Sequence, residues 1–231
     1  MTGGGARHEV HDMETRVITI ARQVGTGGED VAGIVAAATG YRLLDYRVVQ
    51  EAAQEAGVSP ETVSDALHKP SFFARIIEAL ARNPATPASG QWGEPINIAA
   101  TPLLTSVDYR QLIQQVIDDF ANQGRVVLLG HGAQFILKNR QDTLRVLVSG
   151  TVEARTSRLM TAMATDEAKA RELVQRTDKE RIDYFRSYYG EDWLGSSSYD
   201  LIVNTDRLDA QQAAEVILAT VRVRAPLAAS V

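Results

Sequence analysis

The chain alternates between short apolar runs and longer amphipathic stretches. The runs contain many β-branched residues, which is typical of buried strands, and the stretches repeat apolar positions at helical spacing. Strands that alternate with helices join by right-handed crossovers into a parallel sheet covered on both faces, so the pattern predicts an α/β fold. The expected strands are residues 16–21, 41–44, 125–129, 144–148 and 199–203, and the main expected helices are residues 29–39, 105–122, 153–163, 166–184 and 211–223.

The segment between the second and third expected strands breaks this alternation. Residues 46–81 show helical stripes, one of which contains Phe72 and Phe73, whereas residues 83–102 contain four prolines and two glycines with little periodicity. Long irregular loops in compact domains are often functional. We therefore expect residues 46–110 to form a helical insert, in which the apolar stripe is either internal core or the face of a homodimer.

Composition narrows the class of protein. The 231 residues are 45% hydrophobic and 23% charged, with a formal net charge of −5 and no cysteine. The hydrophobic content excludes disorder over most of the length. The absence of cysteine excludes disulfides, thiolate metal sites and cysteine nucleophiles. The negative net charge argues against nucleic-acid binding. No apolar run reaches the roughly 20 residues that cross a bilayer, and residues 1–14 lack the apolar region of a secretory signal. We expect a cytoplasmic protein with no membrane partner, a mobile leader at residues 1–14 and a tail at 224–231.

A glycine-rich turn lies between the first expected strand and the helix that follows it, in the sequence VGTGG at residues 24–28. Glycines permit the backbone conformations with which successive N–H groups bind a phosphate at a helix N-terminus. The P-loop pattern G-x-x-x-x-G-K-[ST] is incomplete, because Arg22 stands at its first glycine and Gly28 at its lysine. The turn is either a phosphate-binding loop or a tight connection, in which Glu29 and Asp30 stabilise the first helical turn.

The expected helix at residues 166–184 is rich in charged residues. A helix that carries arginines can close over phosphates as a lid, because phosphoryl transfer depends on positioning and charge neutralisation. The alternative is a solvated helix with opposite charges four residues apart. At 100° per residue, Arg176, Lys179 and Arg186 share one stripe, and Arg181 points away from it.

The topology predicts where these features meet. Parallel α/β sheets bind ligands beyond the carboxyl ends of their strands. The segments that follow the expected strands are residues 22–28, Asp45, residues 130–132 (GHG) and residues 204–207 (NTDR). We expect them to converge at one edge of the sheet.

The whole arrangement resembles the nucleoside monophosphate kinases, and most closely their cytidylate kinase-like branch. The resemblance implies transfer of the γ-phosphoryl group of ATP, with Mg²⁺, to CMP or a related nucleoside monophosphate. It covers roughly residues 16–222 and rests on stretches at residues 18–28, 40–45, 130–137, 144–148 and 176–208, which are specific together in order and spacing.

The resemblance also implies a division of the chain. The family fold is a P-loop core, a five-stranded parallel sheet with helices on both faces, and it carries a helical insert that binds the monophosphate. The expected ranges are residues 15–45 and 111–223 for the core, about 166–198 for a lid within it, and 46–110 for the insert.

Roles for single residues follow from the same comparison. The amides of Gly25, Thr26, Gly27 and Gly28 would hold the β-phosphate of ATP, and Arg22 would replace the missing lysine. The other expected site residues are Arg176 and Arg181 over the transferring phosphoryl group, Asp45 beside Mg²⁺-bound water or the acceptor, Arg47 and His131 at the acceptor, Asp30 at Mg²⁺, and Thr205, Asp206 and Arg207 beside the adenine.

The chain departs from the family pattern at several positions. A standard cytidylate kinase has lysine at the position of Gly28, a hydroxyl residue at that of Asp30, Gly-Arg-Asp at residues 130–132 and Ser-Gly at residues 46–47. Glu29 and Asp30 would repel a triphosphate unless a metal ion lay between them. The alternatives are therefore an active phosphotransferase, a non-catalytic nucleotide- or anion-binding regulatory protein on a degenerate P-loop fold, and a kinase for another small phosphate acceptor.

Overall fold

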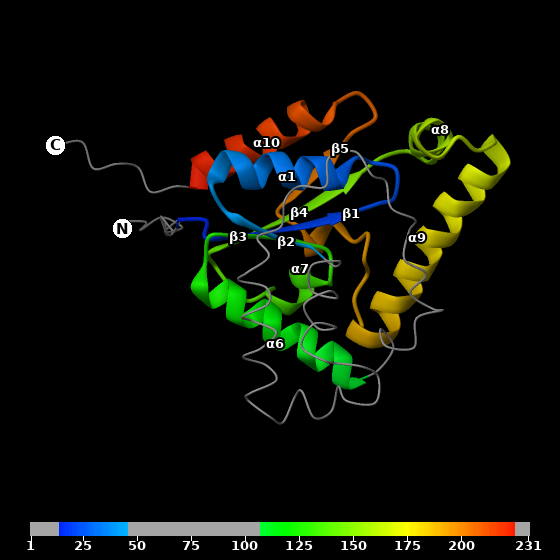
Figure 1. Ribbon diagram of the computed structural model, residues 1–231. Helices are drawn as coiled ribbons and strands as arrows, with labels where there is room; N and C mark the ends of the chain where they lie inside the picture. The colour runs from blue at the N-terminus through cyan, green and yellow to red at the C-terminus, as the bar shows by residue number, and fades with distance from the viewer. Residues whose placement is uncertain (1–13, 46–106, 225–231) are drawn as a thin grey trace, which may run out of the picture.

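The computed structural model describes residues 14–45 and 107–224 and contains a five-stranded sheet (Figure 1). The strands lie in the order β2-β3-β1-β4-β5, and every neighbouring pair is parallel. The predicted parallel α/β fold is therefore confirmed. The strands are β1 (Val17–Arg22), β2 (Arg42–Asp45), β3 (Val126–Leu129), β4 (Thr143–Ser149) and β5 (Leu201–Asn204).

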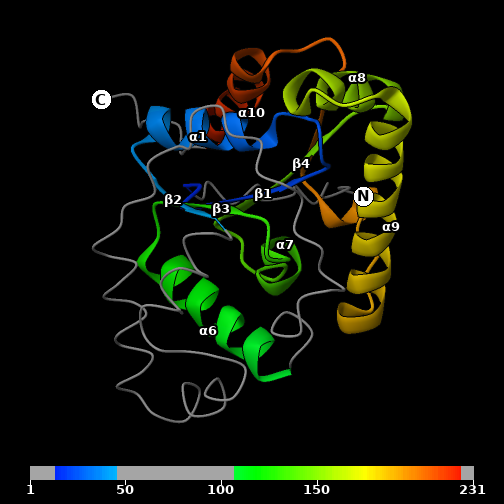
Figure 2. The same ribbon diagram turned by 45° about the vertical axis from the view of Figure 1, so that its right-hand side comes forward.

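Helices cover both faces of the sheet and one of its ends. α1 and α10 lie on one face and α6 and α7 on the other, while α9 passes the carboxyl ends of the strands in both views (Figures 1 and 2). The helices are α1 (Gly28–Thr39), α6 (Val107–Gln123), α7 (Ala133–Ile136), α8 (Val152–Met163), α9 (Glu167–Tyr189) and α10 (Ala210–Arg224), with a short 3₁₀ helix η1 (Ser196–Ser198).

The core forms where the central strands meet α1 and α10. Ile18 and Ile20 of β1 are fully buried, as expected for a central parallel strand covered on both faces. Val31 and Val35 repeat at helical spacing on α1 and pack into the same apolar cluster as Ile217 of α10. This packing anchors β1 and α1, and thus the turn that joins them.

The largest differences from the prediction concern α9 and α7. α9 ends at Tyr189 rather than at residue 184, and Gly190 caps it in the left-handed conformation, with φ 66°. The predicted end was wrong because the many charged residues of this helix leave little apolar periodicity. The last turn is held by aromatic residues that pack against other elements, which the local pattern does not reveal. α7 was not predicted, since four residues are too few to show a period.

Several expectations lie outside the described residues. They concern almost all of the leader at 1–14, nearly the whole insert at 46–110 and the tail after residue 224. Among the described helices, none is long and apolar enough to cross a membrane.

Candidate functional site

The glycine-rich turn forms a compact loop between β1 and α1. Gly25 and Gly27 have φ values of 81° and 74°, which residues other than glycine rarely adopt, and Gly27 is the N-cap residue of α1. The Thr26 hydroxyl donates to the Gln23 carbonyl oxygen at 2.7 Å, which closes the turn. The backbone amides of this loop, the glycine loop (residues 23–28), therefore lie at the start of a twelve-residue helix.

Arg22 is the last residue of β1, and its side chain crosses the edge of the sheet beside the glycine loop. Its Nε donates to Glu29 Oε1 at 2.9 Å, and 17% of its side chain is exposed. Burial acts to raise the pKa of Glu29, but the charge of Arg22 and its hydrogen bond outweigh burial and lower that pKa. Glu29 is therefore ionised at neutral pH and forms an ion pair with Arg22.

Arg181 reaches the same place from α9. Its Nη1 donates to the Arg22 carbonyl oxygen at 2.5 Å, and its guanidinium lies 5.3 Å from the centre of the Trp193 ring. Burial, and then the charge of Arg22, lower the pKa of Arg181 to about 10. The structure thus holds two cationic guanidinium groups beside one loop.

Asp45 is the last residue of β2, and His131 follows β3, on the side of Arg22 away from β4. Asp45 pairs in register with Leu129, so the carboxyl ends of these strands coincide. The pKa of His131 is lowered to about 4: burial lowers it most and the Arg22 charge adds to this, while a hydrogen bond with the Asp45 backbone and the Asp45 charge act to raise it. Three predicted site residues therefore lie together, and the imidazole is neutral at pH 7.

The loop after β5 contacts the glycine loop on the side away from His131. The Thr205 hydroxyl donates to the Thr26 carbonyl oxygen at 3.0 Å. Arg158 of α8 joins the same two loops through the carbonyl oxygens of Gly25 and Thr205. The carboxylate of Asp206 accepts from the Thr151 N–H at 2.8 Å, and Arg207 is exposed.

A buried ion pair behind the glycine loop was not predicted. Arg155 of α8 is 1% exposed and binds both carboxylate oxygens of Asp178 of α9, at 3.1 and 2.7 Å. Gln23 donates to the same carboxylate at 3.1 Å and accepts from the Gly150 N–H at 3.3 Å. No sequence pattern separates Arg155 from a surface arginine, since its burial depends on the distant Asp178.

Arg176 lies on a different face of α9 from Arg181. Its side chain is 55% exposed and lies 3.9 Å from Glu180, and Lys179 pairs with Asp183 at 2.5 Å. Ion pairs between residues four apart are what we expect of a solvent-exposed helix, which was the alternative to an arginine lid. The structure therefore does not bring Arg176 to Arg22 as it brings Arg181.

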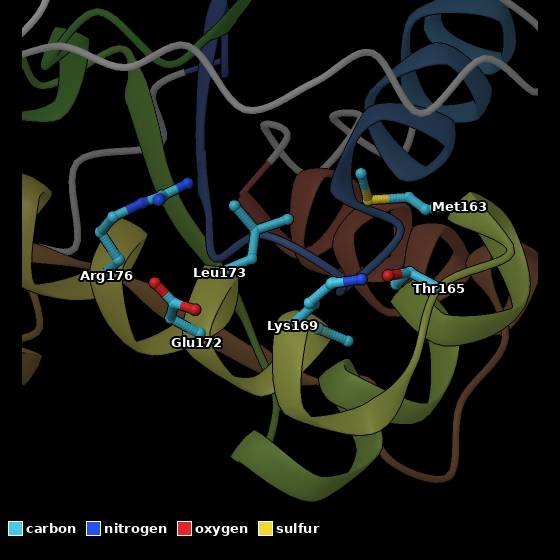
Figure 3. Close-up of a pocket in the computed structure, with 7 residues that line it drawn as sticks. Met163, Thr165, Lys169, Glu172, Leu173 and Arg176 are labelled. Carbon is cyan, nitrogen blue, oxygen red and sulfur yellow. The ribbon is translucent and has the colours of Figure 1, made fainter.

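Arg176 instead lines a pocket of about 290 Å³ between the end of α8 and the first half of α9 (Figure 3). Leu173 and Met163, which also line it, pack with Val24 of the glycine loop against one apolar cluster. The pocket therefore adjoins the loop. The remaining lining residues are Thr165, Lys169, Ala170 and Glu172.

Acidic residues begin α1. Burial, and then the charge of Glu29, raise the pKa of Asp30. No cationic side chain among the described residues lowers this pKa, so a bound cation beside Asp30 would stabilise its carboxylate. Residues 14–45 and 107–224 contain no cluster of three or more metal-ligating side chains. Mg²⁺ bound with a nucleotide needs only one or two carboxylates, because phosphates and waters supply the other ligands. Asp30 fits that requirement. Arg47 lies outside the described residues.

A family model and two curated proteins match parts of this chain. The model of the cytidylate kinase-like family matches residues 17–207. The cytidylate kinase of Methanopyrus kandleri is 26% identical over 109 residues, 44% of this chain and 56% of that protein. An S-adenosylmethionine-dependent nucleotide dehydratase of Lacinutrix mariniflava is 28% identical over 78 residues, 34% of this chain and 16% of that protein. The chain thus spans about half of one curated relative and a sixth of the other.

Solved structures share the fold. An uncharacterized protein from Eubacterium ventriosum has a TM-score of 0.65 at 21% identity, over 91% of this chain and 99% of that one. A gluconokinase from Sinorhizobium meliloti has a TM-score of 0.50 at 14% identity, over 92% and 95% of the two chains. The described residues therefore have the fold of P-loop kinases.

Proposed function

The chain belongs to the cytidylate kinase-like family, and we propose that it is an ATP-dependent phosphotransferase that acts on CMP or a related nucleoside monophosphate. One observation carries this proposal. The glycine loop presents backbone amides at the start of α1, and the guanidinium groups of Arg22 and Arg181 lie beside it. Amides at a helix N-terminus with adjacent cations suit a polyphosphate.

The glycine loop would bind the donor. Amides of Gly25, Thr26, Gly27 and Gly28 would donate to the β-phosphate. The loop that contains Thr205, Asp206 and Arg207 would flank the adenine, a role supported by the hydrogen bond from Thr205 to Thr26. Thr26 closes the loop by donating to the Gln23 carbonyl oxygen through its hydroxyl at 2.7 Å and its N–H at 3.4 Å, so the glycine amides are already oriented before a nucleotide binds.

The arginines would neutralise charge during transfer. Arg22 and Arg181 lie beside the loop and would contact the phosphoryl group as negative charge shifts between donor and acceptor. Arg176 would reach the donor phosphates from the pocket that adjoins the loop. Trp193 and Phe185 cover this side and would exclude water around Arg181.

The acceptor would lie beyond β2 and β3. Asp45 would orient it, and the neutral imidazole of His131 would hydrogen-bond to it without adding charge. Arg47 is proposed as a further acceptor contact. Asp30 would hold Mg²⁺, directly or through water, and the ion would supply charge neutralisation between the phosphates.

Steady-state release of ADP tests the proposal. The purified full chain is given millimolar MgATP and, in turn, CMP, dCMP, UMP, AMP and GMP. ADP release that depends on CMP or another pyrimidine monophosphate is expected. Arg181→Ala should lower kcat about 100-fold or more, whereas Arg222→Ala, at an exposed position on α10, should not change it. ADP release no faster than with ATP alone, for every acceptor, would refute the proposal.

A second candidate function is supported by the pairing of Arg22 with Glu29. The loop's adjacent cation is already neutralised by a carboxylate, as expected for a protein that binds a nucleotide or anion without turnover. Such a regulatory protein would bind ATP and change conformation. ATP binding by calorimetry, together with silence in the ADP assay for every acceptor, would favour this function over phosphotransfer.

A further inference from the structure

Positions 22 and 28 compete for the same space. A Cβ placed on Gly28 would lie 2.7 Å from Cγ of Arg22 and closer still to its Cβ, whereas real Cβ atoms essentially never come within 3.0 Å of a heavy atom from a distant residue. The backbone fixes the Cβ of Arg22, so a new rotamer moves Cγ but leaves the overlap between the two Cβ atoms. With this loop conformation, only one of the two positions can carry a side chain.

The P-loop pattern meets the same restriction with the residues reversed. That pattern places glycine at the position of Arg22 and lysine at the position of Gly28. Here the cation is on the strand and the glycine is on the helix. The missing lysine and the unexpected arginine are therefore two parts of a single exchange.

Neighbouring residues set where the relocated charge lies. Gly130 follows β3 with φ 85°, and a Cβ there would lie 2.5 Å from Arg22 Nη1. Glu29 holds Nε at 2.9 Å on the α1 side. The guanidinium is thus confined between the start of α1 and the end of β3, at the mouth of the glycine loop.

We propose that Arg22 and Gly28 are an exchanged pair, in which the arginine performs from the end of β1 the phosphate-binding task that the lysine performs from α1 in other P-loop proteins. This inference rests on the proposed function for its phosphate ligand. Gly28 is a positioning residue, because it leaves room for the stem of Arg22. The loop is therefore rearranged rather than degenerate.

A stability cycle without nucleotide tests the exclusion. Gly28→Ala is expected to lower Tm by about 5 °C in the presence of Arg22, because the added methyl group overlaps the arginine stem. In the Arg22→Gly background, the same change should leave Tm unchanged or raise it, because alanine favours helix. An equal Tm shift in both backgrounds would overturn the exclusion, whatever the protein binds.

Calorimetric titration with MgATP tests the exchange of the cation. Arg22→Gly and Gly28→Lys should each weaken binding at least tenfold, the first by removing the charge and the second by displacing the loop. The double variant, with glycine at position 22 and lysine at position 28, should bind within about threefold of the natural chain. Ala219→Lys, which adds the same charge at an exposed position on α10, is the control and should not change binding.

The outcomes are distinct. A double variant that binds no better than either single variant would overturn the exchange, and so would full affinity in Gly28→Lys. If the natural chain binds no ATP, the proposed function fails and the phosphate role of Arg22 fails with it. The stability cycle would still decide whether the two positions exclude each other.

Discussion

A buried charged side chain is stable only where other side chains hydrogen-bond to it, and Arg155 is the clearest case in this protein. Arg155 is almost completely buried, yet both of its terminal nitrogens bond to Asp178. Gln23 adds a third bond to that carboxylate. The desolvation of both charges offsets much of the free energy gained when such a pair forms. Removing one partner is strongly destabilising, because the other charge stays buried without water or a counter-charge.

Removal of the Asp178 charge should therefore be strongly destabilising. Asp178→Asn leaves the Arg155 guanidinium buried beside a neutral amide, and we expect a loss of about 3 kcal/mol in the free energy of unfolding. Asp183→Asn, on the same helix, breaks only the exposed pair with Lys179 and should cost less than about 0.5 kcal/mol. Urea denaturation of both variants measures this, and equal losses would contradict the role of the buried pair.

His131 makes stability depend on pH. Its folded-state pKa of about 4 lies below the ordinary 6.5, so the unfolded chain binds a proton that the folded chain rejects. Stability is complete above pH 6.5 and falls as the pH drops towards 4, with a loss of about 2 kcal/mol by pH 5.

Thermal unfolding between pH 7 and pH 5 tests this prediction. In His131→Asn the pH-dependent loss should shrink by most of that amount, and asparagine tolerates the φ of 58° at this position. If the variant loses as much stability on acidification as the natural chain, His131 is not the residue responsible.

At the scale of elements, α9 is held against the core by an aromatic cluster. Phe185 lies 5.2 Å from Phe135 and 6.3 Å from Trp193, measured between ring centres. A Cβ on Gly132 would lie 2.8 Å from the Phe185 ring, so this ring packs directly against the backbone that follows β3. With Asp178 and Arg181, this cluster fixes the position of α9 along the edge of the site.

Truncation of Phe185 should loosen that attachment. Phe185→Ala removes a side chain that is 7% exposed, and we expect a loss of about 3 kcal/mol together with faster hydrogen exchange along the second half of α9. Tyr188→Ala, one turn later with 43% exposure, is the matched control and should lose less than half as much. Equal losses would mean that Phe185 does not anchor the helix.

Elements were predictable where the local pattern was strong. β1 and β3 are continuous β-branched or apolar runs, which indicate central parallel strands before any contact is known. α7 has no period to detect, and the last turn of α9 carries aromatic residues whose partners lie on other elements. Boundaries therefore depend on tertiary contacts that a single segment does not reveal.

At the scale of the molecule, parallel topology brings the site together. Parallel strands bring their carboxyl ends to one edge of the sheet, and the glycine loop, Asp45 and His131 lie together at that edge as the topology predicted. The pairing of Arg155 with Asp178, and the exclusion between Arg22 and Gly28, were not predictable, since each depends on the distance between residues apart in the chain. The topology therefore predicts which segments meet at the candidate site, whereas the side-chain contacts there depend on tertiary packing.

Glycine amide resonances report on phosphate binding at the loop itself. The chain has 17 glycines, so ¹⁵N-glycine labelling gives a simple spectrum in which each loop resonance can be assigned by substitution. On titration with MgATP, the amides of Gly25, Gly27 and Gly28 should show the largest shifts, while those of Gly124 and Gly190 should stay in place. Loop amides that remain unmoved at saturating MgATP, or shifts confined to other glycines, would contradict a phosphate site at the end of β1.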